Sequence, residues 1–168
     1  MLKLPKLLEQ NPEQSKQLRG VLSKSRTLLW EGGRIQVHTC AWTSELEKSI
    51  SFSRRCGAMV GGLEKIRSTL AKEQQGLDLL QERQSDQDHM SPRVSRLLLI
   101  ANDGSERFNR GCESLLANYN ERTLGLVLDT DSSILGKFFG KEAKVKVALI
   151  TRKEAVVRIL TSLIHKEG

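Results

Sequence analysis

The sequence LLLIA, residues 97–101, is a continuous apolar run of strand length in this 168-residue chain. A run without polar alternation predicts a strand that is covered on both faces of its sheet. Asn102 and Asp103 end the run, and Asp103 with Glu106 has the spacing of a capping box. The next segment places its apolar side chains on one helical face (Phe108, Cys112, Leu115, Leu116 and Tyr119). This stretch therefore predicts a strand followed by an amphipathic helix.

The same alternation of strand and helix is repeated further along the chain. TLGLVL at Thr123–Leu128 predicts a second strand, and SSILGKFF predicts a short helix that ends at Gly140. KVKVALI at residues 144–150 predicts a third strand. Thr151 and Glu154 have capping spacing for a last helix with an apolar inward face (Ala155, Val156, Ile159, Leu160, Leu163 and Ile164). The alternation predicts an α/β fold with one sheet between helices, to which at least one further strand must be added.

Two more helices are predicted upstream. ELEKSISFSRRCG predicts a helix that begins at Ser44 with Glu47 and stops at Gly57. AMVGGLEKIRSTLAKEQQ predicts a Gly-Gly turn that leads into a helix with an apolar face (Leu63, Ile66 and Leu70). Residues 77–96 are rich in Gln, Asp, Glu and Ser and are interpreted as an insertion, although leucines 77, 79 and 80 could extend the helix. Within it, residues 81–93 are expected to be poorly ordered or to project, because they have little apolar surface to bury.

The first part of the chain is predicted to be an appendage. Residues 1–43 are interpreted as an irregular, basic N-terminal extension with a hairpin centred on residues 31–33, and residues 44–168 as the main domain. A basic, acid-poor N-terminus is typical of the arm of a ribosomal protein and also of a mitochondrial presequence. Both interpretations stay open at this point.

Composition favours a polyanionic partner. The chain has 27 Lys+Arg against 20 Asp+Glu, a formal net charge of +7 that is spread along its length. Such an excess suits nucleic acid or an anionic membrane face, although a basic protein without a special partner would share it. No apolar run approaches the roughly 18–20 residues that span a bilayer, so no membrane partner is expected. Cys40, Cys56 and Cys112 lack CxxC spacing, and neither a zinc site nor a disulfide framework is predicted.

Catalytic chemistry has no recognisable signature. The chain has 3 His, and His89 and His165 stand in the predicted insertion and near the chain end. The segment GKFFGKE at residues 136–142 is one residue short of a phosphate-binding loop, and Glu142 stands where Ser or Thr would bind magnesium. No G-x-G-x-x-G dinucleotide fingerprint occurs. We therefore expect a protein that is not an enzyme and has no catalytic residues, cofactor, metal site or small-molecule substrate.

Two loops combine glycine with basic residues. In SRRCGAMVGGLEKIR the glycines would let the backbone approach a phosphate, and the following helix start would offer free N–H groups. FFGKEAKVK forms a second basic turn before the last predicted strand. From these loops the candidate RNA-binding residues are Arg54, Arg55, Gly61, Gly62, Lys65, Arg67, Lys141 and Lys144, and the resemblance described next adds Glu64.

Three blocks of the sequence resemble the ribosomal-protein superfamily that binds kink-turn RNA, the L-seven-Ae/L-thirty-e fold. They are SFSRRCGAMVGGLEKIRSTL, LLLIANDGSERFNRGCE and SSILGKFFGKEAKVKVALIT, in the order found in that family. The resemblance is closest to the bacterial YlxQ branch, which follows a YlxR domain in some alphaproteobacteria. It implies a three-layer α/β/α sandwich with a mixed sheet and an RNA surface at one end.

The resemblance also indicates where RNA would be contacted. In kink-turn binders the glycine turn reads Gly-x-Asn-Glu, then two residues and Lys, and here these places are taken by Gly61, Gly62, Leu63, Glu64 and Arg67. Leu63 departs from the pattern, because the amide that it replaces reads base edges in tandem sheared pairs and a leucine can only pack. The insertion and the absence of a YlxR arginine–cysteine motif upstream are further departures.

Two functions are therefore compared. The first is binding of structured RNA, ribosomal RNA in particular, beside neighbouring ribosomal proteins, as a structural component or an assembly factor in translation. Its location would be a mitochondrial ribosome or a bacterial-type cytoplasm. The alternative is a protein-interaction module of a larger complex that keeps the fold and has lost RNA binding, which Leu63 and the scattered charge favour.

Overall fold

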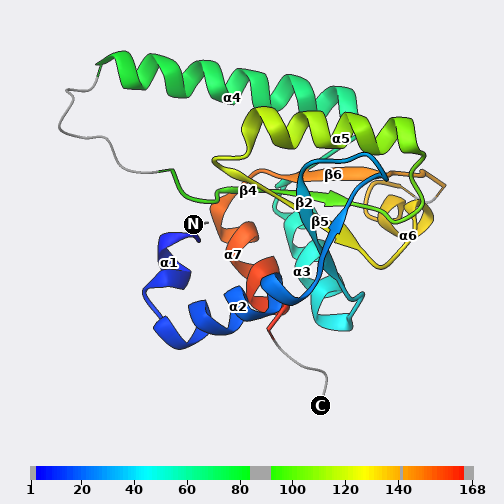
Figure 1. The fold of residues 1–168 in the computed structure, drawn as a ribbon, viewed down its shortest axis with the longest axis horizontal. Helices are drawn as coiled ribbons and strands as arrows, with labels where there is room; N and C mark the ends of the chain where they lie inside the picture. Colours follow the sequence, from blue (N-terminus) through cyan, green and yellow to red (C-terminus); the bar gives the residue numbers. More distant parts are fainter. Residues whose placement is uncertain (1–2, 84–91, 141, 165–168) are drawn as a thin grey trace.

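The computed structural model describes residues 3–83, 92–140 and 142–164, which form a mixed sheet between two layers of helices (Figure 1). The strand order is β1-β2-β5-β4-β6-β3. The strands are Arg26–Leu28 (β1), Gln36–Cys40 (β2), Met59–Gly61 (β3), Arg96–Ile100 (β4), Thr123–Leu128 (β5) and Val147–Ile150 (β6). The helices are Lys6–Glu9 (α1), Pro12–Lys24 (α2), Ser44–Arg55 (α3), Leu63–Arg83 (α4), Glu106–Tyr119 (α5), Ser132–Gly136 (α6) and Lys153–Ser162 (α7). The predicted α/β sandwich with a mixed sheet is confirmed.

The three predicted strands form the centre of this sheet. β4 pairs in parallel with β5 and antiparallel with β6, so that Leu98 lies between Gly125 and Leu149. Burial of both faces explains why LLLIA shows no polar alternation, since each β4 leucine is fully buried. β6 begins at Val147 rather than at residue 144, because Val145 N–H donates to the carbonyl of Ser132 at 3.1 Å outside the sheet.

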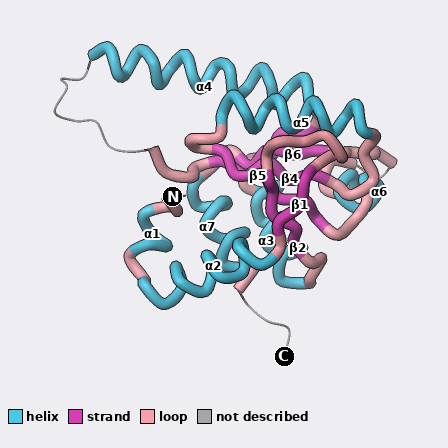
Figure 2. Tube along the Cα trace, viewed as in Figure 1, coloured by secondary structure: helices cyan, strands magenta, loops and turns pink. Residues whose placement is uncertain are grey.

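Two apolar cores lie on opposite faces of the sheet. α4 and α5 cover one face, whereas α1, α2, α3 and α7 cover the other (Figures 1 and 2). A glycine in β5 sets the approach of α5, because a Cβ on Gly125 would lie 2.6 Å from Cδ1 of Leu116. α5 therefore packs closely on the centre of the sheet.

The N-terminal residues are more regular than predicted, and the expectation of an irregular extension is wrong. α2 begins with Asn11, whose side chain accepts a hydrogen bond from Gln14 N–H, and with Pro12 in the first turn. Leu18 and Leu22 lie one turn apart on this helix and are buried against the same core as Leu8 of α1. Each fully buried leucine contributes roughly 1.5–3 kcal/mol. These leucines hold the segment on the domain despite its polar composition.

The predicted hairpin is confirmed, and the structure shows what it packs against. β1 and β2 are antiparallel, with Thr27 opposite Val37, and β2 continues the sheet by pairing in parallel with β5. Glu113 of α5 fastens the connecting loop: its carboxylate accepts hydrogen bonds from Trp30 Nε1 at 3.3 Å and Arg34 N–H at 3.1 Å. The hairpin thus supplies two of the additional strands, and β3 supplies the third.

Three predicted helix caps are wrong in detail, although the helices themselves form. Thr43 rather than Ser44 caps α3, and Ser105 rather than Asp103 caps α5. Asp103 instead accepts hydrogen bonds from the backbone N–H and the hydroxyl of Ser132 at 3.0 and 2.7 Å, which fixes the start of α6. α7 has Arg152 at its N-cap without a side-chain cap, so Thr151 does not cap it. Asp103 therefore does not cap α5, because its carboxylate is hydrogen bonded to Ser132 instead.

The predicted insertion divides into two parts with different environments. α4 continues through Leu79 and Leu80 to Arg83, and this end projects beyond the sheet (Figure 1), with both leucines more than half exposed. Residues 84–91 lie outside the described part of the chain. Within residues 81–93, the expectation of a projecting segment is wrong at Arg93, which is half-buried and donates to the carbonyl of Leu4 at 3.1 Å. Val94, near the end of the predicted insertion, is buried as well, and its N–H donates to the carbonyl of Lys3 at 2.8 Å.

Candidate nucleic-acid interface

The glycine turn joins β3 to α4 at one end of the sheet. Gly61 ends β3 opposite Ala148 of β6, and Gly62 N–H donates to the carbonyl of Val147 at 3.1 Å. Gly62 has a φ of 92°, a left-handed conformation that side-chain-bearing residues rarely adopt. A Cβ on Gly61 would lie 2.9 Å from a ring carbon of Phe139. The two glycines therefore allow a reversal of the backbone and a close approach by an aromatic ring.

The loop between α6 and β6 is folded back against this turn. The backbone of Ala143 passes so close to Gly136 that a Cβ there would meet its carbonyl oxygen at 1.8 Å. The bond between Val145 N–H and the Ser132 carbonyl ties the same loop to the start of α6. This folding brings Lys144 and Lys146 beside the glycine turn, although α4, β4, α5, β5 and α6 separate them in sequence.

The two loops enclose a hollow of about 630 Å³, which we call the basic hollow. Gly61 and Gly62 form its floor, and the rings of Phe108 and Phe139 line it. Its cations come from three different segments and are Arg54, Lys65, Lys144 and Lys146. Glycine, aromatic rings and positive charge are thus combined in one site.

The charge of the basic hollow is not neutralised within the described residues. Its four cations are exposed, and none forms an ion pair with a described carboxylate. Lys146 Nζ lies 5.7 Å from the Phe108 ring centroid, and the Arg54 guanidinium lies 5.4 Å from that of Phe139. Cation–π contacts orient the cations without removing their charge. The hollow therefore has a local positive potential that favours an anion.

The structure brings together most, but not all, of the predicted RNA-binding residues. Five of them line the basic hollow: Arg54, Gly61, Gly62, Lys65 and Lys144. Arg55 lines a neighbouring groove instead. Glu64 and Arg67 form an exposed ion pair at 2.7 Å one turn apart on α4 and do not line the hollow. Lys141 lies outside the described residues.

Five lining residues of the hollow were not among the predicted site residues, and three of them (Phe108, Phe139 and Lys146) supply its rings and its fourth cation. Lys146 stands in the predicted basic turn FFGKEAKVK, and alternation in KVKV places it on the same side of the chain as Lys144. Phe108 was assigned to the buried face of its helix, and it does pack partly on the core while its ring also lines the hollow. Phe139 carried no signal in the sequence, since its contact with Gly61 depends on how the loop folds back.

Leu63 packs inward at the start of α4. Its side chain belongs to the core shared by α4 and α5, and a Cβ on Gly111 would lie 2.8 Å from Leu63 Cδ2. A leucine offers no hydrogen-bond donor or acceptor to a base edge. The first residue of α4, beside the glycine turn, is therefore apolar and half-buried.

The cysteines and the one histidine in the described ranges lie outside the basic hollow. Burial raises the pKa of the Cys40 and Cys112 thiols to about 12, so both stay protonated at neutral pH. Burial also lowers the pKa of His38, whose Nδ1 is hydrogen bonded to the Leu22 carbonyl. Across the described ranges, no group of three or more His, Cys, Asp and Glu residues could hold a metal ion.

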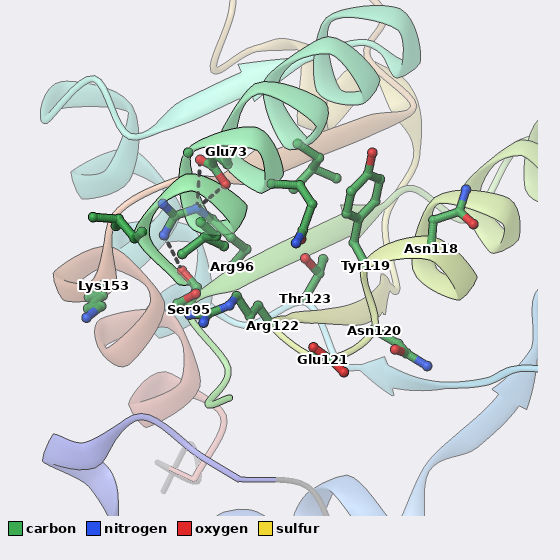
Figure 3. Close-up of a pocket in the computed structure, with 15 residues that line it drawn as sticks. Glu73, Ser95, Arg96, Asn118, Tyr119, Asn120, Glu121, Arg122, Thr123 and Lys153 are labelled. Atoms are coloured by element: carbon green, nitrogen blue, oxygen red, sulfur yellow. Dashed lines mark hydrogen bonds and ion pairs between the residues drawn. The ribbon is translucent and has the colours of Figure 1, made fainter. Parts of the chain in front are cut away.

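A second hollow of about 630 Å³ lies where β4 and β5 begin, between the middle and later turns of α4 and the end of α5 (Figure 3). Its charges are mixed: Arg96 Nε donates to both carboxylate oxygens of Glu73 at 3.0 Å, and Glu121 lines the same space (Figure 3). The basic hollow has no lining carboxylate among the described residues. It is therefore the stronger candidate for binding a polyanion.

None of the helices that the structure describes is both long and apolar enough to cross a membrane. Compared with known proteins, the sequence matches no protein-family model, and no curated protein shows significant similarity to it.

Proposed function

We propose that this protein binds structured RNA, ribosomal RNA in particular, without catalysing a reaction on it. The observation that carries the proposal is the basic hollow, where four unneutralised cations surround a glycine floor and two aromatic rings. Phosphates dominate the affinity of proteins for nucleic acids, and lysine and arginine side chains are their usual partners. Phenylalanine rings can also stack on unpaired bases of folded RNA, and the half-buried rings of Phe108 and Phe139 line the hollow.

The glycine turn supports contact with a phosphate. A Cβ on Gly62 would meet no heavy atom within 4 Å, so the backbone at this point is open to a ligand. α4 begins at the next residue and runs for 21 residues. The first N–H groups of a helix have no partner within the helix, and its dipole favours an anion there. Lys65 lies in this first turn and adds a full positive charge.

The inward packing of Leu63 supports recognition by shape and backbone rather than by base identity at this place. Contacts to phosphate and sugar position an RNA but do not read its sequence. A kink-turn specificity therefore remains a prediction from the sequence resemblance alone. Under the proposal, the fold of the RNA presents its phosphates to the hollow.

The proposed setting is a ribosome, with the protein as a structural component or an assembly factor beside neighbouring ribosomal proteins. This part of the proposal is supported by the three sequence blocks that resemble ribosomal RNA-binding proteins. A mitochondrial ribosome and a bacterial-type cytoplasm both fit it. Co-sedimentation with ribosomal subunits on a sucrose gradient, abolished by ribonuclease, is the expected result.

A protein-interaction module is the second candidate function. The observation in its favour is the projecting end of α4, where Leu79 and Leu80 are 55% and 54% exposed. Exposed apolar side chains that lie together are typical of surfaces that another protein covers. In that case the basic hollow would contribute nothing to binding.

The two candidates differ in the effect of salt and of charge reversal. The proposal predicts that log Kd for structured RNA changes steeply with log salt concentration, and that Lys65→Glu with Lys144→Glu lowers this slope by about two units, one for each phosphate contact. Lys16→Glu with Lys24→Glu on α2 is the matched control, because it makes the same change of net charge on exposed lysines far from the hollow. Equal effects of the two variants, or no RNA binding by the wild type, would refute the proposal.

A further inference from the structure

A second groove lies beside the basic hollow, between α3 and the loop that follows α6. It has a volume of about 690 Å³, and we call it the α3 groove. Its cations are Lys48, Arg54, Arg55 and Lys137. Phe138 lines it as well, with its ring against the edge of Trp42 at a centroid distance of 6.3 Å.

Three of the four cations of the α3 groove lie on the exposed side of α3, and Lys137 lies at the end of α6. Lys48, Ser51 and Arg55 recur at spacings of three and four residues, which places them on one face of α3. The opposite face is buried through Leu46 and Ile50 in the core. Packing of the apolar face therefore fixes the direction of the basic face, and the stripe ends at the basic hollow.

Arg54 connects the two sites, because it lines both. Its Nε donates to the carbonyl of Phe138 at 2.6 Å, and its guanidinium lies over the Phe139 ring. These two contacts hold an exposed side chain in place, and in the described part of the chain no residue accepts a hydrogen bond from the terminal N–H groups of the guanidinium. A guanidinium held in this way loses little conformational freedom when it binds a phosphate.

The charges of the α3 groove are largely available. Arg55 and Lys137 form no ion pair with any residue in the described ranges. Lys48 lies 3.6 Å from Glu45, but both side chains are exposed, and such a pair is weak and screened by salt. Among the described lining residues the carboxylate is that of Glu47. The groove therefore keeps a positive potential, locally opposed by one acidic side chain.

We infer that the α3 groove continues the RNA footprint and takes the sugar–phosphate backbone of a segment that flanks the one in the basic hollow. The inference rests on the proposed function. Charge without deep apolar anchorage suits a phosphate backbone better than an acidic protein segment, which would need buried contacts for stable binding. Phosphate contacts pass from Lys144 in the basic hollow across Arg54 to Lys137 and Arg55 in the α3 groove.

The test uses the full chain. A structured RNA that binds it is first selected from a random-sequence library. Binding is then measured for the intact RNA and for the shortest stem–loop derived from it that still binds. Arg55→Glu with Lys137→Glu is expected to lower the salt slope for the intact RNA by about two units and to leave the shortened RNA unaffected. Glu47→Lys is expected to act in the opposite direction and raise affinity for the intact RNA. A gain of affinity cannot come from misfolding, so this variant protects the test against an unstable double mutant.

The outcomes separate this inference from the proposed function. If Lys65→Glu with Lys144→Glu abolishes binding while the two α3-groove variants leave the intact RNA unaffected, the footprint ends at Arg54 and the inference fails alone. Equal losses on intact and shortened RNA would also overturn it, because they would reflect net charge rather than a flanking segment. If the wild type selects no RNA, both proposals fail together.

Discussion

Arg54 on α3 donates its Nε hydrogen to the backbone carbonyl of Phe138, 2.6 Å away and 84 residues further along the chain. The same guanidinium lies over the ring of Phe139, the next residue. One exposed arginine thus ties the first helix of the candidate interface to the loop that completes it. The contact holds the two sides of the basic hollow in a defined relation.

Substitutions of Arg54 should show how much of the RNA affinity depends on its charge and how much on its hydrogen bond to Phe138. Arg54→Ala is expected to weaken binding of structured RNA on the order of tenfold, because a charge-assisted hydrogen bond to phosphate is lost. Arg54→Lys keeps the charge but cannot donate from a planar Nε to Phe138, so we expect it to restore the salt slope and only part of the affinity. Fluorescence anisotropy at several salt concentrations measures both quantities. Full recovery by lysine would show that the contact with Phe138 is irrelevant to binding.

Substitutions at Gly62 should affect stability and binding separately. Gly62→Ala forces a side chain into φ 92° and is expected to destabilise the domain by about 1–2 kcal/mol. Gly62→Asp adds a negative charge at the floor of the hollow and should remove RNA binding beyond the loss caused by alanine. Urea unfolding and RNA titration measure the two effects.

Gly76→Ala is the matched control for this pair. Gly76 lies in α4, where a Cβ would meet nothing within 4 Å and its φ is not positive. Alanine there is expected to stabilise the helix by up to about 1 kcal/mol without changing RNA binding. Similar RNA affinities for Gly62→Ala and Gly62→Asp would show that no phosphate lies at this glycine.

Leu63→Asn should restore a polar group to the start of α4. The substitution removes a packing contact with Gly111 and is expected to destabilise the domain by about 1 kcal/mol. An RNA with tandem sheared G·A pairs should then bind more tightly, relative to one in which Watson–Crick pairs replace them. The wild type should distinguish these RNAs weakly, because leucine has no hydrogen-bonding group. Strong discrimination by the wild type would mean that other residues read the bases.

Glu9 should make the stability of the N-terminal segment depend on pH. Its carboxylate is bound by the guanidinium groups of Arg93 and Arg19, and Leu4 N–H donates to it at 3.1 Å. The hydrogen bond from Arg93 is the main reason why the pKa of Glu9 lies below its ordinary value of 4.5. The stabilisation is therefore present above pH 4.5 and is lost as the pH falls through the lower pKa of the folded protein.

Glu9→Gln is expected to lower the free energy of unfolding by about 1 kcal/mol at pH 7, a figure reduced for the partial exposure of these side chains. The difference from wild type should shrink as the pH is lowered below 4.5. Glu13→Gln on α2 is the control, since Glu13 is exposed and forms no ion pair with a described residue. A difference that stays constant with pH would show that the charge of Glu9 does not fasten the segment.

The local pattern of the sequence was enough to predict the centre of the fold. Uninterrupted apolar runs predicted β4 and β5, and a period of three to four residues predicted the helices that cover them. These signals are local, because a strand buried on both faces, or a helix buried on one face, shows a characteristic spacing of apolar residues within a few positions. The Gly-Gly turn was predicted for the same reason, since a left-handed backbone at Gly62 restricts the residue type there.

The N-terminal residues and the caps depended on contacts that no local pattern contains. Leu18 and Leu22 form a short apolar stripe in a polar segment. The stripe stabilises the segment only because it packs against the core formed with α7 and the sheet. Asp103 had the spacing of a cap, but Ser132 provided it with two hydrogen bonds from another helix. In both cases a distant partner outweighed the local preference.

The basic hollow shows the same division between sequence and tertiary structure. The sequence by itself determined which residues could serve it: glycines that permit a tight turn, and lysines and arginines that remain exposed. Only the tertiary structure decided that Gly61 lies opposite Ala148 and that Phe139 lies against Gly61, with Lys146 and Phe108 drawn into the same site. The physical reason is that strand register and the folding back of a loop are set by burial and hydrogen bonding over the whole domain, whereas conformational freedom and charge belong to each residue alone.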